Sequence, residues 1–300
     1  MSQLVSLRQK IRSIQTTKKI THAVRLVSMS LYNKLDKMGA PLKTYADGVK
    51  SLLLQLSQAD TAWHHPILSP KDTADTNPLY IIIATSKGLC GSLNSNLFRY
   101  TDTILAGYKE TAPSFIAIGQ KAITFIKNKN NAVLTCSYTE LSSHNFIAIA
   151  DDLIEKISIA PRQYSSVTFL SSEAASFFVQ KPLKLAMAPV ALDAPHLQGG
   201  DVVDAHLKPA LQKSDLAALI WEQDSRLVLD YLASCYLRST ATHALFQALR
   251  AEHAARFLAM ENSTNNAEKI LERLTLQFNK LRQALITKEV SELAAGFPVR

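Results

Sequence analysis

The residues whose types and spacing could support chemistry include one glycine-bearing turn. It runs from Gly88 to Asn94 as GLCGSLN and follows an apolar run. Glycine-rich turns at helix N-termini can bind phosphate through their free amide groups. The turn matches neither GxxxxGK(S/T) nor GxGxxG, because no Lys-Ser/Thr pair follows Gly91 and no third glycine is present. We therefore interpret it as a tight strand-to-helix turn that requires small residues.

Other chemically capable side chains have no recognised arrangement. A group of metal-ligand types has a spacing that fits no zinc or calcium pattern: His196, Asp201, Asp204 and His206. We interpret these as a polar loop, and Asp151-Asp152 as a solvated helix face. Serine and cysteine residues lie in no GxSxG-like nucleophile context. We expect a chain that is not itself an enzyme, with no catalytic residues, no cofactor and no metal.

The charge of the chain is concentrated at its N-terminus. The chain has 300 residues, 47% of them hydrophobic and 19% charged, which excludes a disordered or collagen-like protein. Its net charge is +8, and residues 1–38 carry eight basic side chains against one acid, Asp36, so this arm alone has +7. The three cysteines are far apart and favour a reducing compartment over a disulfide framework. We find neither a membrane-spanning run nor a secretory signal.

The basic arm has four interpretations. It could lie on an anionic membrane, bind nucleic acid through phosphates, or act as a mitochondrial transit peptide. It could instead pack on a partner helix and present its charge to an acidic protein surface. Only the last interpretation explains a matching heptad pattern at the other end of the chain, because a lone apolar seam would have no partner. A basic coiled-coil protein that binds nucleic acid or a membrane surface remains the alternative.

Long helices are expected at both ends of the chain, because residues 1–38 and 210–295 contain neither glycine nor proline. The C-terminal helix is expected from about Ser225 to about Ala295, with Asp224 or Ser225 as its N-cap. Its length, on the order of 105 Å, would make it project from any compact body. Its apolar seam steps by four and three residues: Ala267, Leu271, Leu274, Phe278, Leu281 and Leu285.

The N-terminal helix shows the same spacing with two interruptions. Its apolar series is Leu4, Leu7, Ile11 and Ile14, then Ile20, Val24, Val27, Leu31, Leu35 and Met38. This predicts a register slip between Ile14 and Ile20. Residues Gly39-Ala40-Pro41 are expected to kink or interrupt the helix, which could resume from Tyr45 to Leu56.

The middle of the chain alternates strand and helix patterns, which is typical of a parallel α/β sheet with right-handed crossovers. Asp60–Pro78, including a solvated His64-His65 pair, is interpreted as a surface linker. Expected strands are Leu79–Ser86, Ser114–Ile118, Val133–Tyr138 and Val167–Ser172, with Pro182–Pro189 and Leu216–Glu222 as possible edge strands. Expected helices are Leu97–Lys109, Gln120–Lys127 and Asn145–Ile159.

The predicted fold is therefore α/β, with a long antiparallel coiled coil of the N- and C-terminal helices and an inserted Rossmann-like parallel-sheet domain. We expect an N-terminal coiled-coil helix over residues 1–58. The Rossmann-like domain is expected over 75–222 and the C-terminal coiled-coil helix over 223–300.

Three blocks of sequence resemble the gamma subunit of bacterial F-type ATP synthases, and the resemblance covers essentially the whole chain. They are LRQKIRSIQTTKKITHAVRLVSMS near the start, ATSKGLCGSLNSN in the middle, and AEHAARFLAMENSTNNA leading into LTLQFNKLRQALITKEVSEL near the end. The chain departs from the family at residues 28–31, where small residues are usual, and in its last four residues.

The resemblance implies a central-stalk rotor that carries torque between a membrane c-ring and a hexamer of alpha and beta subunits. It couples ion flow to ATP synthesis or hydrolysis without binding nucleotide. Expected partners are the alpha, beta and epsilon subunits and the c-ring, with no nucleic acid, at the cytoplasmic face of the bacterial inner membrane. The chain would be peripheral to the membrane through these partners.

The resemblance also implies contacts with acidic loops of the beta subunits. By position, the implied residues are Lys18, Lys19, Val24, Arg25, Arg256, Arg282, Gln283, Thr287 and Glu289. The basic arm would then form part of a bearing surface rather than a nucleic-acid site.

Overall fold

The computed structural model describes residues 2–60, 62–69, 77–108, 112–159, 164–190 and 223–295. The chain divides into two compact units. The coiled-coil unit comprises Met1–Leu31, Leu89–Gly91 and Ala255–Arg300, and the sheet unit comprises Tyr32–Gly88 and Ser92–Ala254. The expected strand Leu216–Glu222 and the His196–His206 loop lie outside the described residues.

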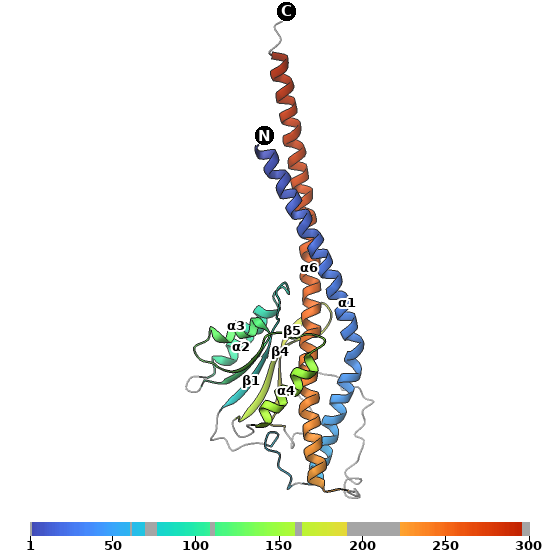
Figure 1. Ribbon diagram of the computed structural model, residues 1–300, viewed down its shortest axis with the longest axis vertical. Helices are drawn as coiled ribbons and strands as arrows, with labels where there is room; N and C mark the ends of the chain where they lie inside the picture. The colour runs from blue at the N-terminus through green and yellow to red at the C-terminus, as the bar shows by residue number, and fades with distance from the viewer. Residues whose placement is uncertain are drawn as a thin grey trace, which may run out of the picture. The chain divides into compact units, whose positions relative to one another are not determined.

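The coiled-coil unit is built from the two ends of the chain. It contains the first part of α1 (Ser2–Ala59) and the last part of α6 (Ser225–Ala295), which lie side by side and antiparallel (Figure 1). The predicted C-terminal seam is confirmed, because Ala267 and the five apolar residues after it are all less exposed than the residues between them. Among the described residues, no helix is both long and apolar enough to span a membrane.

The seam of α1 follows one unbroken heptad, so the predicted register slip is wrong. The buried and half-buried positions step by three and four from Leu4 onward: Leu4, Leu7, Ile11, Ile14, Lys18, Thr21, Arg25 and Ser28 in the coiled-coil unit, then Tyr32, Leu35, Gly39, Leu42, Ala46, Val49, Leu53 and Leu56 in the sheet unit. Three residues assigned to the seam by their apolar type are exposed, namely Ile20 at 57%, Val27 at 59% and Met38 at 38%. The constant heptad phase of the helix, rather than the apolar type of each residue, decides which side chains lie in the seam.

The expected interruption at residues 39–41 is wrong, because α1 continues as one helix through Pro41 to Ala59. Proline in a helix interior costs about 3 kcal/mol. Packing within the sheet unit offsets this cost: Gly39 is buried, and an added Cβ there would lie 3.4 Å from the ring of Phe246 on α6. Leu35 and Leu53, on either side of Pro41, are each 1% exposed.

The described part of the sheet unit contains a five-stranded sheet of order β3-β2-β1-β4-β5. Its strands are β1 (Pro78–Ile83), β2 (Ser114–Ile118), β3 (Val133–Tyr138), β4 (Ser166–Ala174) and β5 (Gln180–Ala188). The first four are parallel, as predicted, and β5 pairs antiparallel with β4 at the edge. The chain moves outward from β1 to β3 and then returns to place β4 on the other side of β1.

Helices cover both faces of this sheet (Figure 1). Side chains such as Ile82 and Phe115 pack with α2 (Leu93–Leu105) and α3 (Gln120–Lys127) on one face. Side chains such as Ile81 and Phe169 pack on the other face with α4 (Phe146–Ile159) and with the parts of α1 and α6 that belong to this unit.

Both edge strands carry an extra residue that breaks their pairing. The register of β3 against β2 skips Thr135, and that of β5 against β4 skips Met187. Strand β5 also contains Pro182 within its pairing with β4, and its side chains Lys181 and Lys184 are exposed. Bulges, proline and lysine are features that discourage the addition of another strand to a sheet edge.

Residues 62–69, which belong to the predicted linker Asp60–Pro78, are not a surface linker, and residues 70–76 lie outside the described residues. Trp63, Ile67 and Leu68 are buried in the core, and the Trp63 Nε1 group donates a hydrogen bond to Asp230 Oδ1 at 2.9 Å. His65 is half-buried rather than solvated, its Nδ1 accepts from the backbone N–H of Ile67, and burial lowers its pKa.

The start of α6 is capped as predicted, since the Asp224 carboxylate accepts a hydrogen bond from the N–H of Arg226 at 3.0 Å.

Candidate functional site

A ladder of polar contacts joins α1 to α6 in the middle of the coiled-coil unit. Lys18 Nζ lies 2.7 Å from Glu268 Oε1, and the hydroxyls of Thr21 and Thr264 are hydrogen-bonded at 2.9 Å. One heptad further along α1, the Arg25 guanidinium pairs with the Glu261 carboxylate. We refer to these six residues as the polar ladder.

The polar ladder exists because the constant heptad of α1 brings polar residues to the seam at positions 18, 21 and 25. Thr264 is 4% exposed, and Ser28, the next seam residue, is 2% exposed. The hydrogen bond from Lys18 lowers the pKa of the Glu268 carboxyl, with the charge of Lys18 acting in the same direction. The ladder therefore carries two cation–carboxylate pairs where an ordinary coiled coil would bury aliphatic side chains.

The structure separates the residues expected to contact beta subunits into two groups. Lys18 and Arg25 are paired across the coiled coil with carboxylates of the same chain, and Val24 and Arg256 are half-buried. The remaining ones are exposed on the outer faces of the two helices: Lys19, Arg282, Gln283, Thr287 and Glu289. Of the two groups, only the exposed one has solvent-accessible side chains that are not paired within the seam.

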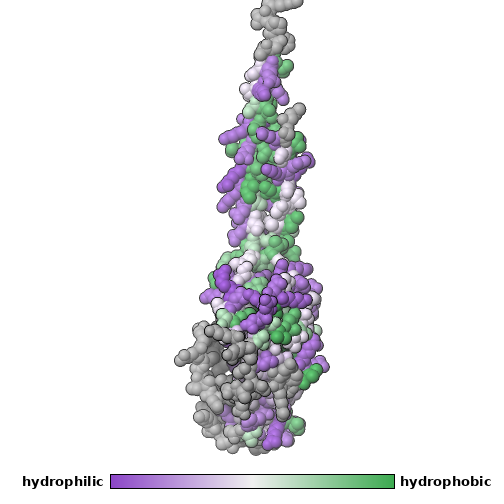
Figure 2. Space-filling view, turned by 90° about the vertical axis from the view of Figure 1, so that its left-hand side faces the viewer, coloured by the Kyte–Doolittle hydropathy of each residue, from purple (hydrophilic) through white to green (hydrophobic). Residues whose placement is uncertain are grey.

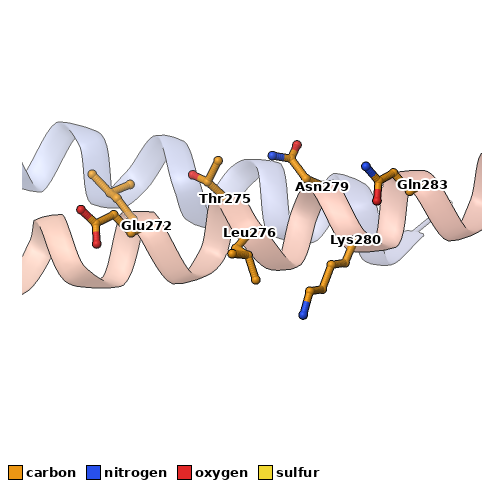
Figure 3. A pocket seen from close by; sticks show the side chains of 7 residues that line it. Glu272, Thr275, Leu276, Asn279, Lys280 and Gln283 are labelled. Carbon is orange, nitrogen blue, oxygen red and sulfur yellow. The ribbon is translucent and has the colours of Figure 1, made fainter.

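A surface groove of about 630 Å³ runs along α6 and includes Gln283 of this exposed group (Figure 3). Thr275, Asn279 and Gln283 form one row at four-residue spacing, and Figure 3 shows Leu276 and Lys280 projecting on the other side of the helix. The row offers a hydroxyl and two carboxamides, which can donate and accept hydrogen bonds to another protein.

Apolar side chains are also exposed on this unit. Hydrophobic and hydrophilic residues are interspersed along the surface that Figure 2 shows. On α1 they include Leu26, and toward the end of α6 they are Ile286, Val290 and Leu293, at 51%, 58% and 66% exposure. The last three recur at four- and three-residue spacing and so share one face of the helix.

The glycine-bearing turn packs against α6 within the same unit. A Cβ added to Gly91 would lie 3.7 Å from the Cβ of Ala259. Leu89 and Gly91 have positive φ angles of 68° and 58°, and Leu89 is 63% exposed. The prediction of a tight turn that requires small residues is confirmed at Gly91. In the described part of the chain, no His, Cys, Asp and Glu side chains are grouped as a metal site.

Residue type alone does not identify four of the ladder residues, because none of them is apolar: Thr21, Glu261, Thr264 and Glu268. For Thr21, a signal was present in the spacing of the apolar residues of α1. Leu4 to Ile14 and Leu35 to Leu56 lie in one heptad phase, which, continued through the intervening residues, places Lys18, Thr21 and Arg25 in the seam.

Comparison with known proteins gives a consistent result over the length of the chain. The model of a family described as ATP synthase matches residues 3–298. The ATP synthase gamma chain of Polaromonas sp. (strain JS666) is 31% identical over 300 residues, covering 97% of this chain and 96% of the relative. That of Pelotomaculum thermopropionicum is 30% identical, covering 99% and 98%.

Solved structures share the fold at lower identity. A chain from the rotor of the Euglena gracilis mitochondrial ATP synthase has a TM-score of 0.63 at 16% identity, covering 95% of this chain and 99% of its own. A chain from the central stalk and c-ring of the Tetrahymena thermophila enzyme has a TM-score of 0.58 at 19% identity, covering 81% and 98%.

Proposed function

Because the chain belongs to the ATP synthase family and its relatives are gamma chains, we propose that it is the rotating central stalk of an F-type ATP synthase. It carries torque between a membrane c-ring and a hexamer of alpha and beta subunits, and so couples ion flow to ATP synthesis or hydrolysis. The chain is a non-catalytic subunit of a membrane-bound complex. The coupled ion is H⁺ or Na⁺, and the chain lies at the cytoplasmic face of a bacterial inner membrane.

The observation that carries this proposal is the antiparallel pairing of the first and last helices in a chain that the family matches from residue 3 to 298. Two helices that share a seam resist bending and twisting better than one. The alternative of a nucleic-acid- or membrane-binding protein does not follow from family membership.

We propose that the hexamer contacts the exposed group of the candidate site, mainly Arg282 and Gln283 with the neighbouring groove. Lys19, Thr287 and Glu289 add polar contacts, and the half-buried Val24 and Arg256 are proposed contacts as well. Lys18 and Arg25 are proposed contacts too, although they are paired with Glu268 and Glu261 in the seam. The epsilon subunit and the c-ring are the other proposed partners.

The direct test is reconstitution. Purified chain mixed with alpha and beta subunits is expected to form a stable complex with MgATPase activity. A known gamma subunit serves as the positive control. Failure to assemble under conditions where the control assembles would contradict the proposal.

The contact residues are tested by the double variant Arg282→Glu with Gln283→Glu, measured as ATP synthesis in membranes. Both side chains are exposed, so we expect the helix content to be unchanged and the coupling to fall. Lys269→Glu, on an exposed position outside the proposed contact, is the matched control. Unchanged synthesis in the double variant would remove these two residues from the torque path.

A further inference from the structure

A histidine caps a short turn in the sheet unit, where an oxygen-bearing side chain is usual. The His65 Nδ1 atom accepts hydrogen bonds from the backbone N–H groups of Ile67 and Leu68, each at 3.3 Å. Ser, Thr, Asn and Asp usually accept these two bonds at the start of a helical turn. Pro66 occupies the next position, where proline is favoured because no N–H is needed there. We call residues 65–69 the histidine-capped turn.

Three further hydrogen bonds close the histidine-capped turn and tie it to the rest of the sheet unit. The Ser69 N–H donates to the His65 carbonyl oxygen at 3.0 Å, and the His65 N–H donates to Ser69 Oγ at 2.9 Å. The Val190 N–H donates to the Leu68 carbonyl oxygen at 3.0 Å. Ile67 and Leu68 are 8% and 1% exposed, so their N–H groups depend on Nδ1, because a buried N–H without an acceptor is costly.

This cap requires a neutral imidazole ring. In the neutral ring one nitrogen accepts a hydrogen bond and the other carries the proton, whereas in the charged ring both nitrogens donate. Because Nδ1 of His65 accepts two bonds, the proton of the neutral ring lies on Nε2. A second proton binds at Nδ1 and there faces the N–H groups of Ile67 and Leu68. Protonation therefore removes both capping bonds at once, which cannot happen at a Ser or Asn cap.

The charged groups near the ring come from α6 and from the segment itself. Asp230 of α6 acts on the ring of His65 through its negative charge. Its Oδ1 atom accepts a hydrogen bond from Trp63 Nε1 at 2.9 Å, and the Trp63 and His65 ring centres are 5.8 Å apart. The Asp60 carboxylate accepts hydrogen bonds from its own segment and from the start of α6. His64, the neighbour in sequence, is exposed.

These surroundings favour the neutral ring near neutral pH. Burial lowers the pKa of His65 by more than the charge of Asp230 raises it. A histidine whose pKa is lower in the folded chain than in the unfolded chain stabilises the fold fully above its unfolded pKa of about 6.5. That stabilisation is lost as the pH falls through the folded-state pKa.

We propose that His65 is a proton-operated latch, which holds the segment after α1 in the sheet unit while its ring is neutral and releases it when Nδ1 is protonated. Release frees the amides of Ile67 and Leu68 and brings apolar side chains that are now buried toward solvent. The strands of the sheet make their hydrogen bonds without the latch, so opening is local. The latch is a property of the chain itself and does not rest on the proposed function.

Hydrogen exchange of the backbone amides, followed by NMR in the full-length chain, tests the latch. Exchange is compared at about pH 7 and about pH 5 as protection factors, which remove the intrinsic effect of pH. Protection at Ile67 and Leu68 should fall roughly tenfold to a hundredfold at the lower pH, since each amide loses its buried acceptor. Protection at Ile81 and Ile82 in the central strand β1 should change much less.

His65→Asn is the matched control, because asparagine Oδ1 stands as many bonds from Cα as histidine Nδ1 and accepts the same hydrogen bonds without titrating. In this variant, protection at Ile67 and Leu68 should be the same at both pH values. His64→Asn, at the exposed neighbour, should respond to pH as the wild type does. Equal losses of protection in the wild type and in His65→Asn would overturn the proposal.

A second measurement needs no change at position 65. In the ring nitrogen NMR spectrum of the chain labelled with ¹⁵N-histidine, Nδ1 of His65 should be the unprotonated nitrogen at neutral pH. It should gain its proton over the pH range in which Ile67 and Leu68 lose protection. His243→Gln identifies the signals of the other histidine whose pKa burial lowers. A neutral ring with its proton on Nδ1 would contradict the latch, and a failed reconstitution with alpha and beta subunits would leave either result intact.

Discussion

Breaking the Arg25–Glu261 pair of the polar ladder should weaken the coiled-coil unit by a measurable amount. The two side chains are 23% and 34% exposed, which places the pair between a surface and a buried ion pair. Exposed pairs contribute about 0.2–1 kcal/mol, and breaking a buried pair costs about 3–5 kcal/mol. After allowance for solvent screening, we expect a coupling free energy of about 1–2 kcal/mol.

The coupling is measured by a double-mutant cycle of Arg25→Met and Glu261→Gln in urea, which, unlike guanidinium, does not screen charge. Far-UV circular dichroism follows the helices, and the fluorescence of Trp63 in a Trp221→Phe background follows the sheet unit separately. The coupling should shrink in 1 M salt, where the Debye length is about 3 Å.

The charge-swapped variant Arg25→Glu with Glu261→Arg should recover most of the stability that either reversal alone loses. A coupling below about 0.3 kcal/mol at low salt would show that the pair behaves as a solvated surface pair and would refute the reasoning.

Three further predictions concern the sheet unit. Gly119→Ala should cost more than about 3 kcal/mol of stability, because Gly119 has a φ of 92° and an added Cβ would lie 2.0 Å from the Ala84 carbonyl oxygen. Gly48→Ala is the control, because an added Cβ there would meet no atom within 4 Å. It should stabilise α1 by about 0.5–1 kcal/mol, and both variants are measured by urea titration. Trp63→Phe should lose about 1–2 kcal/mol with its hydrogen bond to Asp230, and an unchanged urea midpoint would contradict this. Burial lowers the pKa of His243, so its contribution to stability is complete above pH 6.5 and is lost as pH falls through the folded-state pKa; His243→Gln should therefore lose less stability than the wild type between pH 7 and pH 5.

Local pattern predicted most of the sheet unit. Ser114–Ile118 and Val133–Tyr138 were predicted at their observed bounds, because short apolar or β-branched runs lie between turn residues. The helix Gln120–Lys127 was also predicted at its observed bounds, and α6 begins at Ser225 after the predicted Asp224 cap. In these segments the local preferences and the tertiary packing agree.

Prediction failed where packing at a distance overrode local preference. Pro41 lies inside a continuous helix because the neighbouring turns of α1 are buried in the sheet unit. Ile20 and Val27 are exposed because the helix keeps one heptad phase on both sides of them. The partners of Lys18 and Arg25 could not be assigned from sequence, because Glu268 and Glu261 are more than 230 residues away along the chain.

The extra residues in the outer strands β3 and β5 affect how the chain behaves before it is assembled into the complex. A subunit of a large complex must remain unassembled for some time at high local concentration, when any open strand would invite pairing with another copy. The extra residues Thr135 and Met187, together with Pro182 and the lysines of β5, leave both edges poorly suited to such pairing. In the described part of the sheet, neither outer strand therefore offers a long regular edge to another copy of the chain.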